Sequence, residues 1–538
     1  MTSNVRQRLA RALAWLERLA SRRLGAVILF ALGLAVYWVQ AIGWPLTDGR
    51  DLDEYLLDYI QLLNWHPLLP WAMLFRTPVT PVIAGGSLEV WHGRLAEPLL
   101  SVLFAASVVA WSAAARTFGA RPALLVAVAV LVFPAYALMF HELASEVVFA
   151  AAFSGWALLV TRAAARPSTA RFALVGLGVA VLALIRPGNA VLLVFVLFPF
   201  VLPGARRQRA VRAGALATAA ILPLVAWAVL NGARFGDYTL ARGGNAVIPF
   251  YRAFITDKII SPSNGPASRE LANAIQQHLL TRNPYKAYGV TLDEVFKSGS
   301  FRIHEDLYNL SDQVFGWDSD YSVLRRAGIE GVRAHPGKYS RDVLDTIWQE
   351  LSRSYFRTPP SAASTTSSNS QQATIDVNGR QLPAPTEGQP IPGGQNAWIS
   401  RPDNSIRQVW TSPTQYHFAF TIPSQRAPFD SIVREKSELL GRITHRKPNS
   451  ELLLRFNQAS RWFPRPIVWI VVGLIALAIR RPRGSLTLIA LAIGAMLVIA
   501  LNAFGLFADQ HFSLPVAPAF VLLGATALVG PRARAGSD

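Results

Sequence analysis

The chain has 538 residues, of which 52% are hydrophobic and only 16% charged, and it carries 52 Lys and Arg against 33 Asp and Glu. A soluble protein of this length would carry roughly a quarter charged residues, whereas disorder and a disulfide scaffold are excluded by the apolar content and the absence of cysteine. The composition therefore indicates a membrane protein, and its net charge of +19 needs a separate explanation.

Ten apolar stretches are long enough to cross a bilayer as helices, since about 20 apolar residues span the hydrocarbon core. Arg186-Pro187-Gly188-Asn189 interrupts one long apolar run, and proline disfavours helix in the residue before it, so a tight helical hairpin is predicted there. We therefore predict a mainly α, polytopic membrane protein. The predicted spans are 25–43, 98–115, 122–140, 146–161, 170–186, 188–203, 213–231, 465–480, 485–505 and 512–529.

Arginines gather in every second connection between these spans. Such residues mark the cytoplasmic side of a membrane protein, so we expect both termini to be cytoplasmic and segments 44–97 and 232–464 to face outward. The arginine-rich segments contribute 18 of the 19 net positive charges. The basic balance is therefore a sign of topology and gives no reason to expect nucleic acid as a partner. These segments are 1–24, 116–121, 162–171, 204–212, 480–484 and 530–538.

The predicted organisation follows from the spans. Residues 1–24 are expected to form a cytoplasmic amphipathic N-terminus, with a solvated basic tail as the alternative, and the first span is expected to be an uncleaved anchor. Segment 358–397 is rich in Ser, Thr, Gln, Pro and Gly, which predicts a flexible segment. The remaining parts are a transmembrane module at 25–231 with an outer loop at 44–97, an extracytoplasmic insertion of mixed or helical structure at 232–464, C-terminal transmembrane helices at 465–529 and a cytoplasmic tail at 530–538.

The densest group of acids lies just after the first span, at Asp48, Asp51, Asp53, Glu54 and Asp58. A helix starting near Asp51 would place Asp51, Tyr55, Asp58 and Tyr59 on one face. Acids also occur in the first turn of helices for structural reasons, but carboxylates crowded at a membrane interface repel one another and need a partner, a substrate or a metal. A divalent cation held by oxygen ligands is one such partner, although the number of carboxylates alone does not establish it.

A second acidic segment begins the fourth predicted span. His141 and Glu142 resemble half of the zinc-protease pattern His-Glu-x-x-His, but Ser145 stands where the second histidine would be, so that interpretation fails. Glu146, at the mouth of an apolar helix, is suited to orient a donor or to help hold a cation. The structural alternative is a first-turn acid behind a capping Ser145.

Two arginines and one histidine stand out among the cations and cation-capable residues of the predicted outer side. Arg186 is embedded in apolar sequence, and Arg76 follows an aromatic-rich loop. A guanidinium at the membrane boundary suits bidentate phosphate binding, with snorkelling toward lipid headgroups as the alternative. His511 lies in the segment that opens the last span. The nine histidines of the chain form no spaced pair of the metal-binding kind, so we expect no histidine metal site.

These motifs, in this order, resemble the membrane-embedded glycosyltransferases of the GT-C superfamily, of the family 39-like and aminoarabinose-transferase-like kind. The similarity covers residues 25 to about 250 best and 465–529 more loosely. The matching features are Asp51-x-x-x-Tyr55, Arg76-Thr77-Pro78, Ser145-Glu146, Ile185-Arg186-Pro187-Gly188 and His511-Phe512-x-Leu514-Pro515.

The resemblance implies an enzyme of the cell envelope that transfers a sugar from a polyprenyl-phosphate donor to an acceptor hydroxyl on a glycan, lipid or protein, with inversion. It implies a site on the outer face of the bacterial inner or plasma membrane, with Asp51 as general base. Arg186 or Arg76 would stabilise the leaving phosphate, and Glu146 would take the place of the second family acid.

The chain departs from the family pattern in two respects. Asp48, Asp53 and Glu54 lie close to Asp51 and remain candidates for the base. His511 stands where many relatives have arginine, and it is a candidate contact for phosphate or saccharide.

Two other classes of function compete with a glycosyltransferase. A transporter or flippase of lipid-linked sugars is the main alternative, and it would place ionisable residues near the bilayer midplane or in broken helices. Arg186 is the one charge within a long apolar stretch, and the predicted hairpin moves it to the outer boundary. A non-catalytic scaffold would not account for the acidic loop after the first span.

Overall fold

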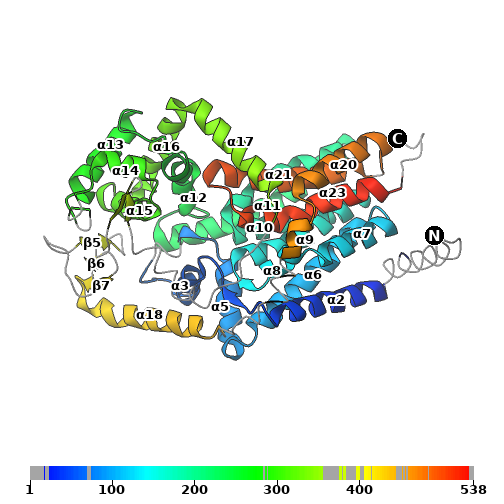
Figure 1. Cartoon of the computed structure of the whole chain (residues 1–538), viewed down its shortest axis with the longest axis horizontal. Coiled ribbons are helices and arrows are strands. Elements are labelled where there is room, and N and C mark those ends of the chain that lie inside the picture. Colours follow the sequence, from blue (N-terminus) through cyan, green and yellow to red (C-terminus); the bar gives the residue numbers. More distant parts are fainter. Residues whose placement is uncertain are drawn as a thin grey trace.

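The computed structural model describes residues 17, 23–69, 74–282, 285–286, 289–355, 375–377, 380–382, 396–399, 405–412, 415–443, 451, 455, 458–482 and 484–531. Helices of the described part run side by side along the long axis of the molecule (Figure 1). The start of helix α2 (Arg23–Ala41) and the end of helix α23 (Ala517–Val529) lie at the same end of this bundle. The opposite end carries the helices and strands of the insertion, and we call it the insertion end.

Seven helices of the described residues are long and apolar enough to cross a membrane, and three shorter apolar helices accompany them. They stand at the ten predicted positions, which confirms a mainly α, polytopic membrane protein. In addition to α2 and α23 they are α6 (Ala96–Arg116), α7 (Ala120–Leu131), α9 (Ser145–Ala165), α10 (Thr169–Ile185), the 3₁₀ helix η2 (Pro187–Val201), α11 (Arg206–Phe235), α20 (Pro466–Arg480) and α21 (Ser485–Gly505).

Prolines set two breaks in the bundle. The predicted hairpin is confirmed, because α10 ends at Ile185 and η2 begins at Pro187, with Arg186 extended between them at φ −145° and ψ 119°. The single predicted span at 122–140 is wrong in detail. It divides into α7 and the short helix α8 (Pro134–Met139), because Phe133 precedes a proline and adopts an extended conformation.

The main core fills the space between the bundle helices with large side chains. Trp111, Trp156, Phe104 and Phe149 are among its fully buried residues. Many apolar side chains remain exposed on the outside of the bundle, including Val27, Leu32 and Val39 of α2, Leu222 and Val229 of α11, and Leu474 and Ile475 of α20. Exposed apolar side chains along helices of this length suit contact with lipid.

The insertion has a helical part with a hydrophobic core of its own, which includes Phe250, Leu271, Leu307 and Leu324. Its helices are α12 (Gly243–Ala246), the π-helix η3 (Val247–Thr256), α13 (Pro266–Ala274), η4 (Ile275–Leu279), α14 (Leu292–Ser298), α15 (Phe301–Val314), η5 (Trp317–Ser319), α16 (Ser322–Ala334) and α17 (Pro336–Ser352).

Strands and one long helix complete the described part of the insertion. The strands are β3 (Ile375–Val377) and β4 (Arg380–Leu382), which pair with each other, and β5 (Asn396–Ile399), β6 (Ile406–Ser412) and β7 (Gln415–Phe420), which form an antiparallel sheet in that order. Helix α18 (Arg426–Gly441) then runs along one side of the molecule toward the bundle (Figure 1) and packs on α3 (Leu52–Gln61) and α5 (Val79–Glu89).

Several sequence predictions fall outside the described residues. They concern most of the N-terminus at 1–24, most of the segment 358–397 and the tail beyond residue 531. The division of the chain into five segments stays a prediction.

Candidate active site

A two-residue parallel ladder joins the loop after α2 to the segment that leads into α9. Strand β1 (Thr47–Asp48) pairs with β2 (Glu142–Leu143), and the backbone N–H of Thr47 donates to the carbonyl of His141 at 2.9 Å. Gly49 allows this approach, because a Cβ atom there would lie 2.5 Å from the Cβ of Ala144. The pairing brings together the two acidic segments that the sequence singled out.

Asp51 stands at the start of α3 in a left-handed conformation with φ 60° and ψ 17°. A non-glycine residue in this region is uncommon, and such residues gather at functional sites. Its side chain makes no capping hydrogen bond to the helix. The carboxylate is 41% exposed, and its Oδ2 atom lies 3.5 Å from Nη2 of Arg76.

Arg76 compensates the acids at the start of α3. One guanidinium nitrogen faces Asp51 and the other contacts the carboxylate of Glu54. The guanidinium also lies over the ring of Tyr55, 5.1 Å from its centroid. The arginine side chain is only 15% exposed, so snorkelling into water or headgroups does not account for its position.

A second arginine–carboxylate pair lies at the start of α9. Glu146 is 4% exposed and contacts a guanidinium nitrogen of Arg186. Nε of Arg186 donates to the hydroxyl of Ser145 at 2.9 Å. The N-terminus of α9 has no side-chain capping bond, so Ser145 binds the arginine instead of capping the helix. The hydroxyl of Thr80 donates to the carbonyl of Ile185 at 3.3 Å and ties α5 to the same hairpin.

Tyr55 lies within electrostatic range of both pairs. This side chain is buried and interacts electrostatically with Arg76, Asp51, Arg186 and Glu146. Burial raises the pKa of Tyr55 above its ordinary value, and Arg76 acts in the opposite direction. The phenol is therefore neutral and can donate a hydrogen bond between the two pairs.

His511 joins the cluster from the C-terminal part of the chain. It lies in the short helix α22 (Gln510–Ser513) and interacts electrostatically with Glu146. Asp509 holds this helix start, because its Oδ1 atom accepts the backbone N–H of His511 at 3.0 Å. The same oxygen lies 3.8 Å from Nε2 of the imidazole.

The remaining predicted site residues lie apart from this cluster. Asp48 is exposed on β1. Asp53 is 57% exposed and faces Lys436 of α18 at 3.9 Å. His141 is fully buried and stacks on the ring of Tyr37 with a centroid distance of 4.0 Å. Glu142 is half-buried in β2.

Asp58 points from the next turn of α3 into the protein. It is 3% exposed, and among the described residues its Oδ1 atom has no hydrogen-bond partner. Burial raises the pKa of Asp58 well above its ordinary value, Arg76 opposes the shift and Glu54 adds to it. Burial therefore shifts this acid toward its protonated form.

Two further features concern metals and missed residues. Within the described residues, no group of three or more acids or histidines is arranged to hold a metal ion. Arg76 and Arg186 bring positive charge to the carboxylates of this site. Sequence reasoning missed Arg50, which lies over the ring of Phe507 at 5.9 Å and 3.9 Å from Asp51. Its position directly before Asp51 is the signal that could have found it.

No family model and no curated protein matches the chain. Two similar solved structures are crystal structures of ArnT from Cupriavidus metallidurans, one bound to undecaprenyl phosphate and one in the apo state. The first is 14% identical, covers 95% of this chain and 78% of that chain, and has a TM-score of 0.33. The second is 15% identical, covers 94% and 78%, and has a TM-score of 0.31. At these values the likeness does not decide what this chain does, and the function has to come from the site.

Proposed function

We propose that the protein is a membrane-embedded glycosyltransferase of the GT-C type, which moves a sugar from a polyprenyl-phosphate donor to an acceptor hydroxyl. The observation that carries the proposal is that two buried or half-buried arginines, each in contact with carboxylates, lie within electrostatic range of the same tyrosine, Tyr55. Arg76 with Asp51 and Glu54 forms one pair, and Arg186 with Glu146 forms the other. A lipid phosphate needs cations beside hydrocarbon, and this site supplies them at one end of an apolar bundle.

The donor has two parts that match two parts of the protein. Its prenyl tail lies in the hydrocarbon, along the exposed apolar surface of the bundle helices. Its phosphate lies at the insertion end, where Arg186 is still 21% exposed and Arg76 15%. His511, which interacts electrostatically with Glu146, would make a further contact with phosphate or sugar.

The reaction is an inverting displacement at the anomeric carbon. The acceptor oxygen attacks this carbon as the bond to the phosphate oxygen breaks, and the bonding electrons leave with the lipid phosphate. Asp51 takes the proton of the acceptor hydroxyl, because its carboxylate is accessible and not used as a helix cap. Arg186 and Arg76 stabilise the charge that grows on the phosphate.

Glu146 has a different role in the reaction from Asp51. It is nearly inaccessible and is held by Arg186, whose Nε is bound in turn by Ser145. A carboxylate in this position fixes the guanidinium beside the donor phosphate and is not free to reach an acceptor. Glu146 is therefore assigned as a positioning residue.

The proposed topology places the insertion end outside the cell. The arginine-rich connections would then lie in the cytoplasm together with both termini, as the positive-inside rule requires. The enzyme would reside in the bacterial plasma membrane, and the insertion would present a glycan, lipid or protein acceptor to the site.

The experiment is an incubation of the purified protein with a panel of polyprenyl-phosphate sugars, and the measurement is release of the lipid phosphate. Asp51→Asn should abolish release while leaving expression and membrane insertion intact. Asp53→Asn is the matched control, since it changes a neighbouring acid that faces Lys436, and it should retain release. Full activity of Asp51→Asn would refute Asp51 as the base. Donor movement across a vesicle without release would favour a flippase and overturn the proposal.

A further inference from the structure

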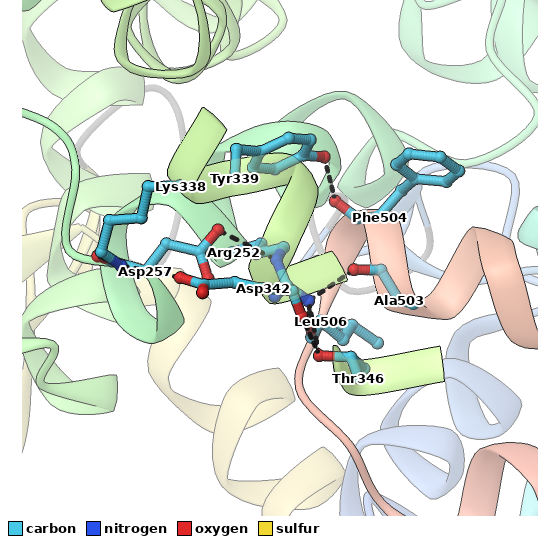
Figure 2. A network of polar contacts seen from close by, with 9 residues as sticks. All are labelled: Arg252, Asp257, Lys338, Tyr339, Asp342, Thr346, Ala503, Phe504 and Leu506. Atoms are coloured by element: carbon cyan, nitrogen blue, oxygen red, sulfur yellow. Dashed lines mark hydrogen bonds and ion pairs between the residues drawn. The ribbon is translucent and has the colours of Figure 1, made fainter. Parts of the chain in front are cut away.

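The last carbonyl groups of α21 accept hydrogen bonds from side chains of the insertion. The last carbonyls of any helix lack partners within the helix and carry a partial negative charge. In α21, Arg252 of η3 donates to the carbonyl of Ala503 at 2.6 Å, and the hydroxyl of Tyr339 of α17 donates to that of Phe504 at 2.8 Å. Figure 2 shows both side chains converging on this helix end from the insertion.

Arg252 also holds the residues that follow α21. Its Nη1 atom lies 2.8 Å from the carbonyl oxygen of Leu506 and 3.1 Å from the hydroxyl of Thr346 (Figure 2). The arginine is 1% exposed, and its Nε atom donates to Asp257 at 3.0 Å, so the buried charge is compensated within the insertion. A guanidinium is suited to this task because it presents several donors in a fixed plane.

The turn at 506–509 has no regular structure of its own. Another contact from the same side reaches it, since Arg353 donates to the carbonyl of Ala508 at 3.3 Å. Just beyond the turn, the hydroxyl of Tyr355 lies 3.0 Å from that of Ser513. Three side chains from η3, from α17 and just after it therefore hold the segment 503–508 that leads to His511, and Tyr355 holds Ser513 just beyond it.

We propose that Arg252 and Tyr339 are positioning residues for the site: they fix the turn at 506–509 and thereby hold His511 beside the Glu146–Arg186 pair. The proposal rests on the proposed transferase function for its kinetic part. It gives the insertion a role in assembling the donor side of the site, in addition to presenting an acceptor. The chain is continuous from the fixed carbonyl of Leu506 to Asp509, which orients His511.

The structural part is tested by thiol labelling. The chain has no cysteine, so Ala508→Cys places a single reporter in the half-buried turn. Tyr339→Phe removes one hydrogen bond and keeps the ring, and it should raise the maleimide labelling rate about fivefold, the factor expected for one hydrogen bond. Arg252→Lys should raise it further, and Arg252→Gln further still. Arg326→Gln, which breaks an exposed ion pair with Glu270 in the same insertion, should leave the rate unchanged.

The functional part is tested with the same variants in the full-length protein. Tyr339→Phe and Arg252→Lys should raise the donor KM several-fold, and each effect should shrink to near unity in a His511→Gln background, because residues that act through one another are not additive. Unchanged labelling rates, or equal effects with and without His511, would overturn the proposal. If the parent chain releases no lipid phosphate, the proposed function fails, and the labelling rates still decide whether Arg252 and Tyr339 fix the turn.

Discussion

The Nη2 atom of Arg76 lies 3.5 Å from Oδ2 of Asp51, while Nη1 of the same guanidinium contacts Glu54. One planar group thus joins the exposed acid at the start of α3 to an acid one turn further on. Its position over the ring of Tyr55 fixes the plane in which it does so. This geometry gives Asp51 a defined orientation even though its side chain is 41% exposed.

The first prediction follows from the shape of this guanidinium. Arg76→Lys keeps the charge, but an ammonium group cannot bridge two carboxylates in a plane and stack on Tyr55 at the same time. We expect kcat/KM for lipid-phosphate release to fall about 100-fold, a loss of the size seen when one transition-state donor is removed. Arg94→Lys is the control, because Arg94 is exposed near the end of α5. A loss smaller than threefold for Arg76→Lys would contradict the bridging role.

The second prediction concerns Glu146 and Arg186. Arg186→Met leaves the carboxylate of Glu146, 4% exposed, without its counterion. Removing one partner of a buried pair costs about 3 to 5 kcal/mol, so we expect a clear fall in thermal stability in detergent. Adding Glu146→Gln removes the unpaired charge and should restore most of that stability.

Measurements of activity should separate the effect of the Glu146–Arg186 pair on folding from its effect on the donor phosphate. The double variant Arg186→Met/Glu146→Gln should be stable and yet release no lipid phosphate, because the phosphate has lost its guanidinium. Substantial release by the stable double variant would show that Arg186 serves folding alone. The comparison of melting curves with release rates is the measurement that decides this point.

The bundle could be predicted from the sequence because its signals are local. Apolar runs of sufficient length gave the ten spans, and the Pro187 break placed Arg186 at the end of a helix. The break at Phe133 is not predicted, because Pro134 lies inside an apolar run that is long enough for a single span. The two-residue pairing of Thr47 and Asp48 with Glu142 and Leu143 has no periodic pattern, so no local signal could indicate it.

The site was predicted in part for the same reason. The helical spacing predicts that Asp51 and Tyr55 lie on one face. Which neighbouring acid contacts Arg76 depends on the left-handed start of α3 and on α18, whose Lys436 faces Asp53. Both are tertiary features. The contacts of Arg252 with Ala503 and Leu506 join residues about 250 positions apart, and backbone acceptors leave no trace in the sequence.

The third prediction is a pH dependence of stability from Glu350. This acid of α17 is 2% exposed, and both its oxygens lack a hydrogen-bond partner of normal geometry among the described residues. Burial raises the pKa of Glu350 from 4.5 to about 7, and Ser513 and Arg353 oppose the shift only in part. The folded state therefore holds the proton more tightly than the unfolded state, and the corresponding stability is lost as the pH rises from 4.5 through about 7.

Glu350→Gln should remove that dependence. At pH 8 the variant should be more stable than the parent by about 3 kcal/mol, whereas at pH 5 the difference should be small. Unfolding in detergent at pH 5, 6.5 and 8 is the measurement, with the exposed Glu270→Gln as the matched control. If the difference in stability between the parent and the variant is the same at pH 8 as at pH 5, Glu350 is charged and paired in the folded protein.

The fourth prediction separates two acids on the same helix. Asp58 is buried, and one of its oxygens has no hydrogen-bond partner in the part of the chain that the structure describes. Burial raises its pKa well above the ordinary value, whereas Asp51 is accessible and faces Arg76. A raised folded-state pKa means that Asp58 costs stability once the pH exceeds the ordinary range of an aspartate. Asp58→Asn mimics the protonated acid, so it should stabilise the protein by about 1 kcal/mol or more at pH 8 and have little effect at pH 4.

The same substitution should leave lipid-phosphate release within about threefold of the parent, since an acid that is only 3% exposed is not accessible to the hydroxyl of an acceptor. Asp51→Asn should show the reverse, with lost release and unchanged stability, because its carboxylate makes no capping bond to α3. Unfolding and release measured side by side for both variants test this reciprocity. Loss of release with Asp58→Asn and its retention with Asp51→Asn would move the proton acceptor two turns along α3, from the accessible end of the helix into the protein.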